Sequence, residues 1–117
     1  MNARFDERGE VGILTVAGRL DAGPHAEDFR KALQDLLDRG HARLVLDLEG
    51  VHFLDSAGLG EIVAARRRCR ERGGALVLAR PRGKPRDLIA LTRVDELVPV
   101  LDDLDAAVAR AAGDGNR

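Results

Sequence analysis

The stretch "FLDSAGLGEIV", residues 53–63, joins an apolar run to a segment with helical spacing, and it decides the fold of the chain. The apolar run ends at Asp55, and a single hydroxyl follows at Ser56. Leu59 and Ile62 then lie three residues apart, which places them on one face of a helix. The stretch therefore places Asp55 and Ser56 between a strand-like run and a predicted helix.

Apolar runs of strand type lie on both sides of this stretch, at residues 43–50 and 75–79. Strands separated by a helix need a crossover connection, so the centre of the sheet is predicted to be parallel. We expect an α/β fold in which one small mixed sheet, with an antiparallel N-terminal hairpin, is covered by about four helices. The other predicted elements are strands at 3–7 and 11–18, an edge strand within 97–101, and helices from Pro24 to Gly40 and over 57–72, 85–92 and 102–112.

Length and composition predict a single small domain. The chain has 117 residues, so we expect one domain over residues 1–112 and a flexible tail over residues 113–117. The net charge of −1 gives no general attraction to nucleic acid or to an anionic membrane. A lone Cys69 and the lack of a signal-peptide pattern favour a cytoplasmic protein.

Two basic segments, residues 65–74 (ARRRCRERGG) and 80–86 (RPRGKPR), stand out locally. The arginines of the first segment spread around the helix axis, and no aromatic residue lies nearby for base stacking. We interpret them as solvated helix and loop surface, with orientation of a charged partner as the alternative. Direct binding of nucleic acid is not expected.

One interpretation makes Ser56 a catalytic nucleophile at a strand-to-helix turn. The hydrolase signature there is Gly-x-Ser-x-Gly, but Leu54 occupies the first glycine position. The hydrolase order also needs a histidine after the serine, whereas every histidine of the chain precedes it: His25, His41 and His52. We therefore expect no catalytic residue, and neither a metal site nor a cofactor is indicated.

Two other roles for Ser56 stay open, a helix cap and a phosphate acceptor. Ser and Asp are both favoured caps, so Asp55 can fill that position equally well. Capping does not explain Gly58 and Gly60, since each glycine inside a helix costs about 0.5–1 kcal/mol relative to Ala. Their small size would let another backbone or a protein surface come close, which suggests a contact surface more than a stable helix start. A helix N-terminus also accommodates a phosphate, which adds about −1.5 to −2 charges.

The segments "GRLDAG" (18–23), "VLDLEGVHFLDSAGLGEIV" (45–63) and "RERGGALVLA" (70–79) resemble those of STAS domains. More narrowly, they resemble bacterial anti-sigma factor antagonists, whose pattern includes Asp-Ser, a small residue and Gly-Leu-Gly at a strand-to-helix junction. The resemblance covers residues 3–112. One departure is Arg93-Val94, where relatives often carry Gly-Leu.

The resemblance implies a phosphorylation switch at Ser56, the serine that follows the family's invariant acid. That acid is Asp55 here, and Asp21 matches an acidic residue near the family's partner surface. Ala57 leaves no neighbouring hydroxyl to compete for the phosphate. The implied partner-binding residues are Asp21, Asp55, Ser56, Ala57, Gly58, Leu59, Gly60 and Ile62.

From the same resemblance we expect an anti-sigma factor antagonist that acts as a monomer or weak dimer away from membranes. When unphosphorylated, it would bind an anti-sigma factor serine kinase with a histidine-kinase-like ATPase fold and so free a sigma factor. The kinase would carry its own ATP and magnesium, and a phosphatase would reset the switch at Ser56. The alternative is a STAS scaffold or accessory subunit in a stress-signalling or lipid-transport assembly without an obligatory phosphorylation switch.

Overall fold

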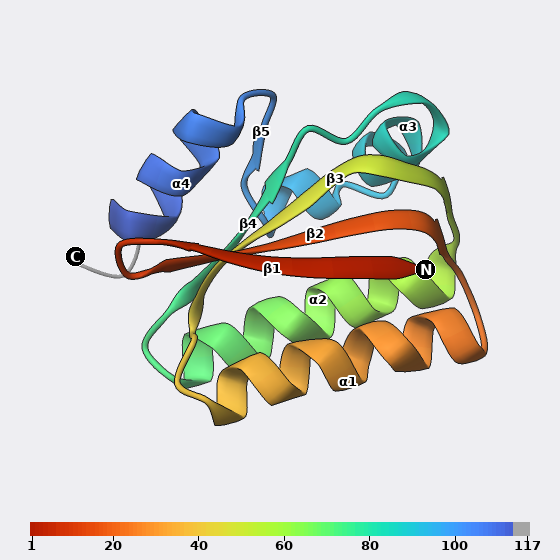
Figure 1. Ribbon diagram of the computed structural model, residues 1–117. Coiled ribbons are helices and arrows are strands. Elements are labelled where there is room, and N and C mark those ends of the chain that lie inside the picture. The colour runs from red at the N-terminus through yellow and green to blue at the C-terminus, as the bar shows by residue number, and fades with distance from the viewer. Residues whose placement is uncertain (114–117) are drawn as a thin grey trace.

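Five strands form one sheet: β1 (Asn2–Arg8), β2 (Val11–Leu20), β3 (Arg43–Leu54), β4 (Ala75–Ala79) and β5 (Val100–Leu101). The computed structural model describes residues 1–113 and places the strands in the order β1-β2-β3-β4-β5 (Figure 1). β1 and β2 pair antiparallel, and each later strand runs parallel to its neighbour. The predicted α/β fold with an antiparallel hairpin and a parallel centre is confirmed.

The helices of the described chain are α1 (Pro24–Asp38), α2 (Ser56–Glu71), α3 (Gly83–Leu91), α4 (Leu104–Gly113) and the 3-10 helix η1 (Val94–Glu96). α1 and α2 lie side by side on one face of the sheet, and α4 covers the opposite face (Figure 1). The predicted tail starts at Gly113, which is the last residue of α4, and its residues 114–117 lie outside the described part. No helix within residues 1–113 is long and apolar enough to cross a membrane.

The side chains of β3 alternate between the two faces of the sheet. Leu44, Leu46 and Leu48 are buried in the larger core, under α1 and α2. Val45 points to the smaller core, which is completed by Ala107 of α4. This two-sided burial explains why β3 reads as a nearly continuous apolar run.

β3 extends four residues beyond its predicted end at Gly50 and runs to Leu54. The polar residues Glu49 and His52 interrupt the apolar pattern in the sequence, but both are exposed in the structure. Val51 and Leu54 remain buried between them, and β2 keeps pairing with this part of β3 across two register shifts. Irregular pairing with a neighbouring strand is a tertiary feature, so local periodicity did not predict it.

Gly73 and Gly74, which lie between α2 and β4, are needed for different structural reasons. Gly73 has φ +75°, a left-handed conformation that ends the helix. A Cβ on Gly74 would lie 1.9 Å from the carbonyl oxygen of Ala42, so only glycine lets β4 start this close to the chain before β3.

Candidate partner-binding site at the start of helix α2

The junction between β3 and α2 lies at the carboxyl ends of two parallel strands. Leu54 is the last residue of β3, and it pairs with Leu20, the last residue of β2. α2 begins at Ser56, so the connection consists of Asp55 alone. Binding sites of α/β sheets form outside the carboxyl ends of strands. The local sequence therefore places Ser56 at the edge of the fold where ligands and partners usually bind.

Asp55 is the N-cap of α2 and also ties the helix to a neighbouring loop. One carboxylate oxygen accepts a hydrogen bond from the amide of Gly58 at 3.0 Å, and the other accepts one from the amide of Ala22 at 3.0 Å. These bonds, first that from Gly58, lower the pKa of Asp55 below its usual value. Asp55 therefore fixes the start of α2 against the loop after β2.

The structure assigns the capping role to Asp55 and leaves Ser56 without one. Ser56 is the first residue of α2 and is exposed. Within residues 1–113 its hydroxyl forms no hydrogen bond. Of the two caps that the sequence left open, only Asp55 is used, so the Ser56 hydroxyl is available to another molecule.

Gly58 and Gly60, which the sequence grouped together, differ in what surrounds them. A Cβ on Gly58 would lie 2.1 Å from the carbonyl oxygen of Leu20, so Gly58 is needed for packing of α2 against β2. A Cβ on Gly60 would meet no heavy atom within 4 Å. At Gly58 the close contact is therefore with another part of the backbone of the same domain, one of the two alternatives that the sequence left open. At Gly60 the fold imposes no such requirement.

The residues predicted to bind a partner differ in how exposed they are. Ser56 and Gly60 are exposed, and Asp21, Asp55 and Ala57 are half-buried. Gly58, Leu59 and Ile62 are buried, and Ile62 has no exposed surface. These three residues shape the surface from below, whereas the exposed ones can touch a partner directly.

A shallow depression of about 350 Å³ lies next to Ser56. Ser56, Leu59 and Gly60 form one end of it. Val63 and Arg67 continue it along α2, and Val94 contributes from η1. The depression gives this end of α2 an apolar recess beside the free hydroxyl.

Asp21 belongs to a charged cluster beside the same helix start. Its carboxylate lies 2.5 Å from Nδ1 of His25 and 2.8 Å from Nη2 of Arg19. The hydrogen bond with His25, followed by the contact with Arg19, lowers the pKa of Asp21. The Arg19 guanidinium also stacks over Phe53, with its carbon 4.1 Å from the ring centroid. The cluster holds Asp21 as a carboxylate.

Sequence reasoning missed Phe53 as part of this surface. Phe53 is 38% exposed and offers an apolar surface at the edge of the site. It pairs in register with Arg19 across β2 and β3, and this pairing follows a register shift. The available signal was that "GRLD" and "FLDS" both end parallel strands, which brings Arg19 and Phe53 to one edge.

Cys69 does not take part in this site. It is fully buried on the inner face of α2, as the sequence predicted for a small core residue. Burial raises the pKa of its thiol to about 11, so the reactive thiolate is scarce at neutral pH.

Known proteins resemble the chain over nearly its whole length. The family described as "Mlab, STAS domain" matches residues 3–99. A protein of Bordetella bronchiseptica, provisionally named the anti-sigma factor antagonist BtrV, is 29% identical over 109 residues, which are 93% of each chain. The anti-sigma F factor antagonist of Paenibacillus polymyxa is 25% identical over 107 residues, 88% of this chain and 90% of the relative.

Solved structures support the same assignment. An anti-sigma factor antagonist from Mycobacterium paratuberculosis superimposes with a TM-score of 0.83 at 26% identity, over 95% of this chain and 93% of that one. The anti-sigma factor antagonist SpoIIAA, solved in its unphosphorylated form and, as a Bacillus cell fate determinant, in its phosphorylated form, shares the fold at 20% and 18% identity. Each superimposes with a TM-score of 0.70, over 96% and 93% of this chain and 99% and 98% of SpoIIAA. The chain therefore belongs to the STAS domain family.

Proposed function

We propose that this protein is a cytoplasmic, non-enzymatic anti-sigma factor antagonist whose unphosphorylated form binds an anti-sigma factor kinase and thereby frees a sigma factor. The observation that carries the proposal is the state of Ser56: its side chain is exposed and its hydroxyl is unbonded, because Asp55 already caps the helix. A kinase can therefore reach the hydroxyl without first breaking a contact that holds the domain together.

Phosphorylation of Ser56 would change the charge of this surface sharply. The phosphate would add about −1.5 to −2 charges beside Asp21 and Asp55, whose pKa values are both lowered, so that both are carboxylates at neutral pH. The N-terminus of α2 favours negative charge, so the domain itself tolerates the group. A partner seated on the helix start would meet repulsion and lost packing, and the complex would weaken.

Two observations on related proteins support the proposal: the names that the relatives carry and the fold that they share with this chain. Relatives that align with nearly the whole chain carry the name anti-sigma factor antagonist. SpoIIAA has been solved with and without its phosphate in the same fold. In the proposed cycle the anti-sigma kinase supplies ATP and magnesium, and a phosphatase removes the phosphate from Ser56.

The chain offers an unusually clean test of the phosphorylation step, because Ser56 is its only serine. Each candidate anti-sigma kinase of the same genome is incubated with the protein and magnesium-ATP, and the product is read by intact-mass spectrometry. We expect one phosphate on the wild type and none on Ser56→Ala.

The matched control for this assay is Thr92→Val. Thr92 is one of two threonines, and its hydroxyl donates to the carbonyl of Leu88 at 2.7 Å. This variant loses a hydroxyl and keeps Ser56, so it should be phosphorylated like the wild type. Equal phosphate incorporation by Ser56→Ala and the wild type would contradict the proposal. The absence of phosphate transfer by every candidate kinase would favour a scaffold role.

A further inference from the structure

β1 forms an open edge of the sheet. It comes first in the strand order and pairs with β2 alone, so within residues 1–113 no strand lies on its outer side (Figure 1). Six of its seven residues are exposed, and Phe5 is half-buried. The backbone along this edge offers hydrogen-bonding groups to solvent, and such an edge is a template for pairing with another chain.

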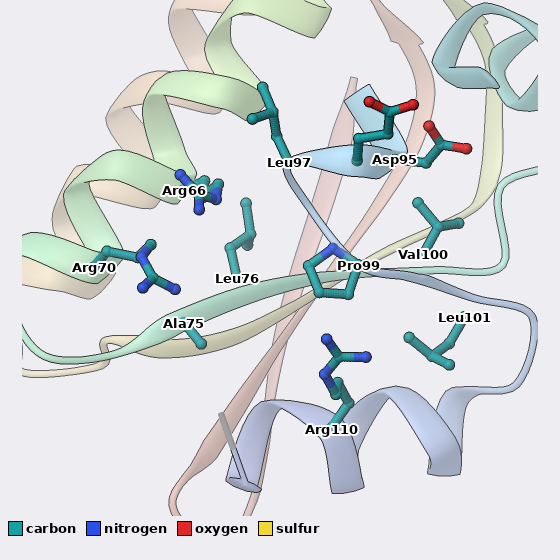
Figure 2. A pocket seen from close by; sticks show the side chains of 11 residues that line it. Arg66, Arg70, Ala75, Leu76, Asp95, Leu97, Pro99, Val100, Leu101 and Arg110 are labelled. Carbon is teal, nitrogen blue, oxygen red and sulfur yellow. The ribbon is translucent and has the colours of Figure 1, made fainter. Parts of the chain in front are cut away.

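The opposite end of the sheet is covered. β5 pairs with Leu78 and Ala79, and the preceding residues of β4 are buried even though β5 does not reach them. Figure 2 shows the groove of about 540 Å³ on that side, which Leu97, Pro99 and Arg70 help to line. β1 is therefore the edge that a further strand can reach.

The turn between β1 and β2 determines which backbone groups of β1 face outward. Gly9 has φ +61° and Glu10 does not have a positive φ, which is the pattern of a two-residue hairpin turn with glycine at its first position. Such a turn closes with a hydrogen bond between the residues that flank it, Arg8 and Val11. Hydrogen-bonded and non-hydrogen-bonded pairs alternate along an antiparallel ladder. The backbone groups that point away from β2 are therefore those of Ala3, Phe5 and Glu7.

The charges of β1 are complementary to those of the same strand running in the opposite direction. A two-fold axis through Phe5 would place Arg4 of each copy opposite Asp6 of the other. Both side chains are available, since that of Arg4 is 74% exposed and that of Asp6 is 60% exposed. Opposite charges that face each other across two strands are stabilising. The remaining pairs also avoid like charges: Asn2 with Arg8, and Ala3 with Glu7.

The neighbouring registers are less favourable. An axis through Arg4 or Asp6 would place that side chain opposite its own copy, and like charges directly opposite each other are destabilising. These registers would also shorten the paired segment to residues 2–6 or 4–8. The sequence of β1 therefore selects the register centred on Phe5, in which the whole strand is paired.

We propose that two copies of this chain associate through β1, antiparallel and centred on Phe5, so that their two sheets join into one. The outward backbone groups of Phe5 would pair with those of Phe5 in the second copy, and those of Ala3 with those of Glu7. The interface is the same on both copies and uses the open edge of each, so the assembly closes as a dimer.

The proposed dimer does not depend on the switch at Ser56. Each β2 runs antiparallel to its own β1, so the carboxyl ends of the two β2 strands point to opposite ends of the joined sheet. Ser56 follows the end of β3, which pairs with the end of β2. The two Ser56 sites therefore lie at opposite ends of the dimer, and either proposal can fail while the other holds.

Sedimentation equilibrium of the full chain tests for the dimer, at protein concentrations from about 10 µM to about 1 mM. The seven residues of β1 span about 24 Å, so the interface is small, and we expect a reversible dimer with a dissociation constant within this range. A wild type that remains monomeric, or that assembles beyond a dimer, overturns the proposal.

Exchanging the two central charges tests the register. Arg4→Asp and Asp6→Arg should each self-associate at least about tenfold more weakly, because each change places like charges opposite each other at two positions. A mixture of these two single variants should form a heterodimer, since opposite charges then meet at both positions. The double variant Arg4→Asp/Asp6→Arg should dimerise within about threefold of the wild type. Both recoveries require folded variants, so they exclude misfolding as the cause of the loss.

Two further variants separate strand pairing from general charge attraction. Ala3→Pro removes an outward amide and spares the pairing with β2, so it should weaken the dimer at least about fivefold. Arg70→Asp is the matched control, because it reverses an exposed charge beside β4, and it should dimerise like the wild type. The proposal is also overturned if either single charge variant or Ala3→Pro dimerises like Arg70→Asp, or if the mixture and the double variant fail to recover.

Discussion

Asp55 divides its two carboxylate oxygens between the helix that it caps and the loop after β2. Both bonds are 3.0 Å long and reach backbone amides, of Gly58 and of Ala22. The side chain therefore joins two segments that are 33 residues apart in sequence. Because Asp55 already caps the helix, the hydroxyl of Ser56 is left free for another role.

Asp55 should contribute to the stability of the domain through its two hydrogen bonds to backbone amides. Asp55→Ala should lower the free energy of unfolding by about 1–3 kcal/mol at pH 7, because it removes a cap and leaves two amides unpaired. The folded-state pKa of Asp55 is lowered, so its contribution is present above the unfolded value of about 4 and is lost as pH falls through the folded-state pKa. Denaturant unfolding at pH 7 and pH 3 should show the difference from the wild type narrowing in acid.

Asp28→Ala is the control for that comparison. Asp28 is exposed on α1 and has no ion pair or hydrogen bond within residues 1–113. Its removal should change stability by less than about 0.5 kcal/mol at either pH. A loss at Asp55→Ala that matches this small change, or that grows in acid, would contradict the role given to Asp55.

Gly58 and Gly60 allow a paired prediction on one helix. Gly58→Ala should lower the free energy of unfolding by about 1–3 kcal/mol, because the added Cβ would lie 2.1 Å from a backbone oxygen that cannot easily move. Gly60→Ala should raise it by up to about 1 kcal/mol, because its Cβ meets nothing and alanine favours a helix. Chemical denaturation measures both; changes of the same sign would refute the assignment.

At the scale of elements, the end of α3 shows how this chain departs from the family pattern. Arg93 takes φ +60°, the left-handed region that glycine adopts without strain, and it stands where the family resemblance implied Gly. Val94 is buried at 6% exposure, so it fills the apolar position that Leu would otherwise occupy. The turn into η1 is therefore kept with different residues.

The left-handed conformation of Arg93 should cost the domain stability. Arg93→Gly should raise the free energy of unfolding by about 0.5–1 kcal/mol, since it relieves the left-handed strain and gives up only a weak, exposed ion pair with Glu96. Thr92→Gly is the control, because Thr92 has φ −88° and loses a hydroxyl bond to Leu88. Thermal or denaturant unfolding should move the two variants in opposite directions, and a destabilised Arg93→Gly would be inconsistent with strain there.

At the scale of the whole molecule, much of the fold follows from local sequence. Alternation in β2 and β3 and helical spacing in α1 and α2 predict the order of elements, and crossover connections then dictate a parallel centre. The extension of β3 to Leu54 escaped prediction because it depends on irregular pairing with β2. Likewise, the exposed Phe53 and the internal need for Gly58 arise from contacts with Arg19 and Leu20, which are distant in sequence.

The candidate site could be predicted only in part, because some of its features depend on tertiary contacts. A motif placed Asp55 and Ser56 at a strand-to-helix junction, but only the tertiary structure distinguishes the cap from the free hydroxyl. Burial of Leu59 and Ile62 follows from the helical face that they share, which the spacing already indicated.

The molecule thus keeps its core apart from its proposed switch. The large core lies between the sheet and the pair α1 and α2, whereas Ser56 lies outside the carboxyl ends of the strands. A phosphate there would change the surface without entering the core. The domain should therefore fold equally well in both states, and partner affinity should carry the signal.

The most direct test of this account is the affinity of the anti-sigma factor kinase for three forms of the protein, measured by isothermal titration calorimetry. The kinase is the candidate that phosphorylates Ser56. Ser56→Ala should bind within about threefold of the wild type, because a small uncharged side chain preserves the surface. Ser56→Asp should bind at least about tenfold more weakly, because it adds a negative charge beside Asp21 and Asp55. Equal affinity of Ser56→Asp and the wild type, with both folded, would contradict the central claim.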